Sequence, residues 1–120
     1  MLGFIAGELN ALGIPYEFGQ WTTSPIQYPY WVGEYIEEES LEEDGKEECN
    51  FILTGFTRGA FLTLEKQKEQ IKDYFWQGVS KIENGIGYTA FYQNAFPIAE
   101  DDPELKKIQV ELKLMKWKER

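Results

Sequence analysis

The side chains that could carry out chemistry in this sequence are one cysteine and many carboxylates, because the chain has no histidine. Histidine is the commonest general base and metal ligand, so its absence removes the usual partner of a nucleophile. Cys49 lies in a run of residues typical of a strand. Because free cysteines are mostly buried, we expect Cys49 to be a structural core residue. We assign no catalytic residue and no cofactor.

Two short acidic runs are the candidates for a metal site. Glu100-Asp101-Asp102 and Glu42-Glu43-Asp44-Gly45 offer the oxygen ligands that hard cations prefer. Neither run has the spaced ligands and the closing glutamate of an EF-hand loop, so solvated loops are the better interpretation and no metal is predicted. A pair of carboxylates could serve a glycosidase, but nothing in the pattern selects a pair. The sequence also lacks a Walker loop and a GxGxxG motif.

The length and charge of the chain restrict its class. With 120 residues, we expect a single domain over residues 1–120. The net charge is −9, from 21 acidic and 12 basic residues, which disfavours general binding of nucleic acid because phosphate recognition depends on clustered Lys and Arg. No apolar run is long enough to span a membrane, and Glu8 interrupts the short apolar start, so we expect no signal peptide and synthesis in the cytoplasm.

The charges are segregated along the chain. Nine acids lie between Glu34 and Glu48, and basic residues gather near the C-terminus. The candidate acidic hairpin contains Glu37, Glu38, Glu39, Glu42, Glu43 and Asp44, and the candidate basic face contains Lys106, Lys107, Lys113, Lys116 and Lys118. One interpretation is a solvated hairpin tip whose repulsion protects an edge from aggregation. The other is a head-to-tail contact between the hairpin of one subunit and the basic face of its neighbour, which forms a ring if the rotation closes.

Aromatic residues make up 16 % of the chain, which favours a folded domain and also indicates use at an interface. They are concentrated in the segment 21–31, around Pro25 and Pro29. Together with one residue near the C-terminus, the candidate interface residues are Trp21, Tyr28, Tyr30, Trp31 and Trp117. Core packing is an equally good interpretation of these rings, because aromatic side chains dominate cores and interfaces alike.

The elements that would position these residues begin with a helix. Apolar residues recur at helical spacing over residues 2–12, and Gly13 ends the pattern. Residues 14–19 are typical of an edge strand. The segments 30–37 and 46–56 then predict a long hairpin with a projecting acidic tip, because Asp-Gly between two strand-like runs is a strong hairpin signal. Cys49, Phe51 and Leu53 share one face of the second strand, which we expect to be central.

A second helix is predicted over residues 63–82, with Thr63 as its N-cap and Asn84-Gly85 ending it. Its buried stripe would consist of Leu64, Ile71, Phe75, Val79 and Ile82. Two further strands are predicted, over residues 87–97 and from Ile108 onwards. The order of elements predicts an α+β fold, with an antiparallel or mixed β-sheet, a long protruding hairpin and two helices packed on one face.

The last predicted strand has the clearest alternation, with Ile108, Val110, Leu112 and Leu114 on one face. Beyond this run the apolar face changes to Met115 and Trp117. Such a change indicates a bulge or an exposed apolar end of the strand.

Four short sequence motifs, or phrases, are spread over nearly the whole chain. They are Leu12-Gly13-Ile14-Pro15-Tyr16, Tyr28-Pro29-Tyr30-Trp31-Val32, Asp44-Gly45-Lys46 and Ile108-Gln109-Val110-Glu111-Leu112. The first is similar to the opening of the small tail-terminator or head–tail joining (minor tail) proteins of long-tailed bacteriophages and prophages, a short helix followed by a V/I-P-hydrophobic strand. The others resemble that family's P-Y-I-V strand, hairpin turn and I-Q-V/I-E-L strand. In the family the last phrase follows soon after the turn, whereas here it comes after the long helix.

The resemblance implies a non-enzymatic α+β subunit of the virion tail. It implies assembly on the end of the tail tube, commonly as a hexameric ring, where the ring stops tube growth and presents the docking surface for the head. Its partners would be further copies and other tail or connector proteins, with no membrane and no specific nucleic-acid binding. The acidic hairpin would then line the lumen, where negative charge lets DNA pass without sticking.

Two alternative functions belong to other classes. The first is an acidic inhibitor or DNA mimic that binds a basic nucleic-acid-processing protein with a steep dependence on salt. The second is a small enzyme, which would require a deep polar pocket with convergent carboxylates.

Overall fold

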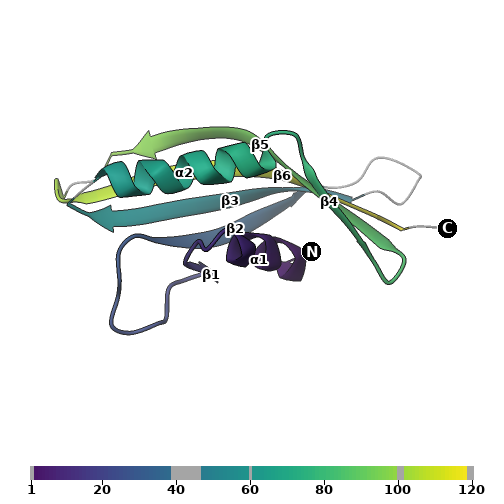
Figure 1. Ribbon diagram of the computed structural model, residues 1–120, viewed down its shortest axis with the longest axis horizontal. Coiled ribbons are helices and arrows are strands. Elements are labelled where there is room, and N and C mark those ends of the chain that lie inside the picture. Colours follow the sequence, from purple (N-terminus) through teal and green to yellow (C-terminus); the bar gives the residue numbers. More distant parts are fainter. Residues whose placement is uncertain (1, 39–46, 60, 100–101, 119–120) are drawn as a thin grey trace.

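The computed structural model describes residues 2–38, 47–59, 61–99 and 102–118, without the side chains of residues 36–38 and 118. Its helices are α1 (Leu2–Ala11) and α2 (Phe61–Phe75). Its strands are β1 (Tyr16–Phe18), β2 (Tyr30–Glu38), β3 (Glu47–Arg58), β4 (Val79–Glu83), β5 (Ile86–Ile98) and β6 (Leu105–Lys118). Both helices lie on the same side of one sheet (Figure 1).

The strands form one mixed sheet in the order β1-β2-β3-β6-β5-β4. The edge strand β1 is parallel to β2, and the other neighbours are antiparallel. The predicted α+β fold, with a mixed sheet and two helices on one face, is therefore confirmed. The predicted hairpin is formed by β2 and β3, whereas its tip lies outside the described residues. The expectations that β1 lies at an edge and β3 inside the sheet are also confirmed.

The core lies between the sheet and the helices. Alternate residues of β3 and β6 are buried, as the period of two in a strand requires, and they form one cluster with both helices. The sheet contributes Trp31, Cys49, Phe51, Leu53, Ala90, Ile108, Val110, Leu112 and Leu114, and the helices contribute Phe4, Ile5, Leu9, Leu64, Ile71 and Phe75. The Tyr74 hydroxyl donates a hydrogen bond to Glu8 and so joins the two helices. Burial of Cys49 confirms its predicted place in the core.

The prediction for the second helix is wrong at its C-terminal end. The helix stops at Phe75, and Gly78 has a φ of 87°, a left-handed conformation suited to glycine. Val79 begins β4, whose Ile82 is 63 % exposed, so neither residue extends a buried helical stripe. Asn84 and Gly85 have φ values of 52° and 77°, which are typical of a two-residue hairpin turn. The Asn-Gly pair therefore joins two strands and does not end a helix.

Two smaller predictions also change. Thr63 lies inside the first turn of α2 and cannot be its N-cap. The predicted change of the apolar face after Leu114 does occur, but without a bulge: β6 keeps its alternation, and Met115 and Trp117 lie half-buried on the side away from the helices. The irregularity lies in β5, where the pairing passes from Tyr92 directly to Asn94. One extra residue in β5 is the signature of a bulge.

Candidate functional site

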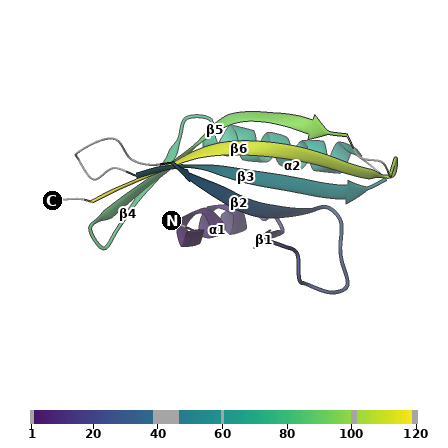
Figure 2. The same ribbon diagram turned by 180° about the vertical axis from the view of Figure 1, so that it is seen from behind.

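One face of the sheet carries no helix in the part of the chain that the structure describes. Figure 2 shows β2, β3 and β6 from this side, with α2 behind them. The register of the strands assigns the side chains of this uncovered face. On β2, β3, β5 and β6 they are Tyr30, Val32, Glu34, Glu48, Asn50, Ile52, Thr54, Phe56, Arg58, Thr89, Phe91, Asn94, Phe96, Ile98, Leu105, Lys107, Gln109, Glu111, Lys113, Met115 and Trp117. Most of them are half-buried by their neighbours in the sheet, so apolar area remains open to a partner.

Aromatic side chains gather at one end of the uncovered face. The Tyr30 ring centroid lies 5.0 Å from that of Phe56 on β3, 5.5 Å from Tyr28 and 4.9 Å from Trp21. The Lys107 Nζ lies 5.1 Å from the centroid of the Phe56 ring. These distances are typical of stabilising ring pairs and of a cation–π contact. We call Trp21, Tyr28, Tyr30, Phe56 and Lys107 the aromatic patch.

A hydrogen bond network holds the loop that carries Trp21. The Glu17 carboxylate accepts bonds from the Thr22 hydroxyl at 2.6 Å, from the Thr22 amide at 3.2 Å and from the Thr23 amide at 3.3 Å. These hydrogen bonds hold the pKa of Glu17 below its usual range, and the bond from the Thr22 hydroxyl contributes most. The Trp21 Nε1–H is buried and has no hydrogen-bond partner among the described residues. The loop therefore places the Trp21 ring on Tyr30 by local anchoring at Glu17.

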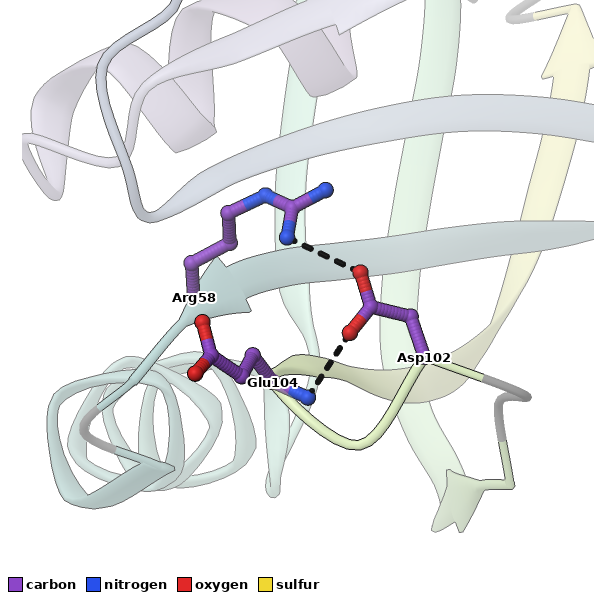
Figure 3. Close-up of polar contacts among 3 residues, drawn as sticks. All are labelled: Arg58, Asp102 and Glu104. Carbon is purple, nitrogen blue, oxygen red and sulfur yellow. Dashed lines mark hydrogen bonds and ion pairs between the residues drawn. The ribbon is translucent and has the colours of Figure 1, made fainter.

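An ion pair at the same end of the sheet fixes the border of the patch (Figure 3). The Arg58 Nη1 donates to the Asp102 Oδ2 at 2.9 Å, and the Glu104 amide donates to the Asp102 Oδ1 at 3.0 Å. The hydrogen bond from the Glu104 amide and, to a lesser extent, that from Arg58 lower the pKa of Asp102. A hydrogen bond with Tyr28 raises the pKa of Arg58. Arg58 thus connects the end of β3 to the β5–β6 connection and to the loop before β2.

The structure separates the predicted interface residues. Trp21, Tyr28 and Tyr30 lie together in the patch, whereas Trp117 lies at the other end of the uncovered face, packed over Gly87. Assignment of Trp31 to an interface is wrong, because its side chain is completely buried and its Nε1–H donates to the Gln67 Oε1 at 2.8 Å. Neighbouring residues of a strand point to opposite faces, so Tyr30 on the uncovered face requires Trp31 on the helix side.

The predicted basic face is divided by the same alternation. Lys107 and Lys113 lie on the uncovered face, Lys106 and Lys116 lie on the opposite face, and the Lys118 side chain is outside the described residues. One continuous face made by these five lysines is therefore not formed. The Lys113 Nζ lies 3.2 Å from the Glu48 Oε2 of the adjacent β3. The basic strand thus neutralises part of the acidic hairpin within the same chain.

Most of the predicted acidic hairpin lies beyond the description of the structure. Glu37 and Glu38 are at the end of β2, with backbone only described, and Glu39, Glu42, Glu43 and Asp44 fall in the gap between β2 and β3. The positions of Glu38 and Glu47 show that this acidic segment starts and ends at the far end of the β2–β3 pair from Tyr30 and Phe56.

Phe56 and Arg58 were not predicted from the sequence, and Asp102 was predicted only as part of a solvated acidic loop. Phe56 could have been found from the alternation Ile52, Thr54, Phe56 once the register with Tyr30 was known. A further aromatic group was also missed on the helix side, where the Lys72 Nζ lies 5.6 Å from the Trp76 ring and 5.8 Å from the Tyr92 ring.

Comparison of the chain with protein-family models and with curated proteins finds no match. Within residues 2–38, 47–59, 61–99 and 102–118, no group of three or more Cys, Asp or Glu is arranged to hold a metal ion. Across the same residues, neither helix has the length and apolar character needed to cross a lipid bilayer.

Proposed function

We propose that this protein is a non-enzymatic structural subunit of a phage or prophage tail. In this proposal it caps the tail tube and forms the head–tail junction as a ring of identical copies. The resemblance implies that the ring is a hexamer and that the protein is located in the virion tail. The observation that carries the proposal is the uncovered face of the sheet with an aromatic patch at one end. This surface is suited to a protein partner.

The chemistry of the uncovered face supports binding of protein. The uncovered face carries Val32, Ile52 and Ile98 beside aromatic rings. Covering this apolar area with another surface is favourable by about 25 cal/mol for each Å² removed from water. Tyr and Trp concentrate the binding energy of protein interfaces because they combine a large apolar ring with a polar tip. The interspersed Glu34, Glu111 and Lys113 provide the polar surroundings of such a contact.

The shape of the molecule supports assembly of several copies. Its principal extents are 50 × 26 × 25 Å. The β4–β5 hairpin extends past the helices at one end, and the loop before β2 lies at the other (Figure 1). The end with the loop before β2 carries the aromatic patch, and the other end does not. Contacts between unlike surfaces of identical subunits generate closed rings or open filaments.

Three of the four phrases that carry the resemblance lie in described parts of this fold, whereas Asp44-Gly45-Lys46 lies outside the described residues. Residues 12–16 form the turn from α1 into β1, residues 28–32 enter β2, and residues 108–112 lie in the middle of β6. Gly13, with a φ of 74°, ends the helix, and the buried Ile14 joins the core before β1 begins. Each of these three phrases thus forms part of the sheet or leads into it.

The proposal is tested by mixing the purified protein with polymerising tail-tube subunits and measuring tube length and end occupancy by electron microscopy. We expect capped ends and shortened tubes. A Tyr30→Ala/Phe56→Ala variant should cap less well, whereas Trp76→Ala, which removes an exposed ring from the helix side, should cap normally. Tubes unaffected over a wide concentration range would reject the proposal, and capture of a basic nucleic-acid-binding protein would then favour the acidic-inhibitor function.

A further inference from the structure

The aromatic patch has a defined chemical preference. Its rings form a surface for an apolar group, and cations stand at its border: Lys107 over the Phe56 ring, and Arg58 beside Tyr28. The Arg58 side chain is 48 % exposed although it is paired with Asp102. A ligand that fits this arrangement has one apolar side chain flanked by carboxylates, because the apolar group covers the rings while the acids lie near the cations.

The chain itself contains a segment with this composition. Residues 37–48 read Glu-Glu-Glu-Ser-Leu-Glu-Glu-Asp-Gly-Lys-Glu-Glu. Leu41 is the single apolar side chain among eight acids in this stretch. The segment therefore combines an apolar anchor with negative charge on both sides, the complement of the patch.

The segment cannot reach the patch of its own chain. Tyr30 and Phe56 form the first pair of the β2–β3 ladder, and Glu38 and Glu48 form the last pair. Eight residue steps along β2 correspond to about 26 Å at roughly 3.3 Å per residue. Residues 39–46 are anchored at both ends by these strands, so the middle of the segment reaches at most about 14 Å from them. Contact with the patch must therefore come from another copy.

We propose that the aromatic patch of one copy binds the segment 39–46 of a second copy, with Leu41 on the rings and the acids beside Lys107 and Arg58. This inference rests on the self-assembly in the proposed function and specifies its contact. Because the two surfaces differ and lie at opposite ends of the sheet, the contact is head-to-tail and repeats from copy to copy. Opposite charges across it should also make assembly sensitive to ionic strength.

A charge exchange tests the contact. Lys107→Glu and Glu42→Lys/Glu43→Lys/Asp44→Lys are prepared separately and combined in one chain, and self-association is measured by sedimentation velocity with and without tail tubes. Each separate variant should raise the apparent Kd by about tenfold or more, since each places like charges at every contact. The combined variant restores opposite charges at every contact and should recover most of the affinity. Leu41→Ala should weaken association without changing its dependence on salt.

Lys106→Glu is the matched control, because it makes the same charge change on the neighbouring residue of β6 but on the opposite face. It should associate as the wild type does. The inference is overturned if Lys107→Glu behaves like Lys106→Glu, if the combined variant stays as weak as its parents, or if the wild type remains monomeric in solution and at tube ends.

The same measurements separate the two proposals. If the wild type and the charge variants cap tubes equally well, the tail function stands and this contact is rejected. If self-association follows the charge exchange but tubes remain uncapped, the contact stands and the tail function is rejected.

Discussion

The two faces of β3 differ in burial although both contain apolar residues. Toward the helices, Phe51 and Leu53 are completely buried, whereas Ile52 and Phe56 on the other face keep part of their surface exposed. The helix side is filled by contacts within the chain, and the uncovered face is rich in apolar and aromatic groups without such a cover among the described elements. Burial within one chain therefore accounts for the apolar residues on the helix side, and the apolar residues on the uncovered face are available for contacts with a partner.

The largest expected effect is on the free energy of unfolding, when neighbouring side chains on the two faces of β3 are removed separately. Phe51→Ala should lower the free energy of unfolding by about 3–5 kcal/mol, because it leaves a cavity in a packed core. Ile52→Ala should lower it by roughly 1 kcal/mol, because the half-buried Ile52 side chain contributes less apolar burial that can be lost. Denaturant unfolding of the monomer measures both values. Equal losses would show that the two faces contribute equally to the stability of the single chain.

Two glycines test the same difference between the faces with a smaller expected effect. A Cβ at Gly55 would lie 2.7 Å from ring atoms of the buried Trp31 and from the Leu64 side chain, which have no space to move. Gly55→Ala should therefore destabilise the protein by about 1–3 kcal/mol. A Cβ at Gly87 would overlap the Trp117 indole, but Trp117 is only half-buried on the uncovered face and can change its rotamer.

Gly87→Ala should consequently have the smaller effect on the unfolding midpoint of the two substitutions. Near-ultraviolet circular dichroism should still report a change in the surroundings of a tryptophan. A larger loss of stability for Gly87→Ala than for Gly55→Ala would contradict the view that the uncovered face can adjust.

The smallest expected effect concerns the ion pair at the border of the patch. Hydrogen bonds from the Glu104 amide and from Arg58 lower the pKa of Asp102 in the folded state. Its stabilising contribution is therefore present above the ordinary pKa of an aspartate and is lost as the pH falls through the depressed folded value. Asp102→Asn should reduce the loss of stability on acidification, measured from thermal unfolding between neutral pH and about pH 2. An unchanged acid profile would show that this exposed pair contributes nothing measurable.

Strand alternation allowed much of the covered face to be predicted from the sequence. In β3 and β6 every second residue is apolar, so Phe51, Leu53 and Val110 could be assigned to one face before the register was known. The end of α2 could not be found in the same way. Val79 and Ile82 continue a helical spacing by coincidence, although Gly78 and the Asn84-Gly85 turn favour a hairpin.

The candidate site was predicted only in part, because it depends on contacts between distant segments. Trp21, Tyr28 and Tyr30 are close in sequence and were selected together by composition. Phe56 and Lys107 join them only through the pairing of β2 with β3 and of β3 with β6. Trp31 was misassigned because a local cluster of rings does not specify which face each ring occupies, whereas the register of a strand does.

The outer strands of the sheet have a consequence for how copies can meet. β1 has three residues and β4 has five, and they flank β2, β3, β5 and β6, which have nine to fourteen residues. A long exposed edge would offer a template on which strands of other chains add through backbone hydrogen bonds, as in amyloid growth. β1 pairs with only three residues of β2 and β4 with only five residues of β5, so the outer edges of both long strands extend beyond their strand neighbours among the described residues. These uncovered stretches of backbone are where a strand of another copy could add.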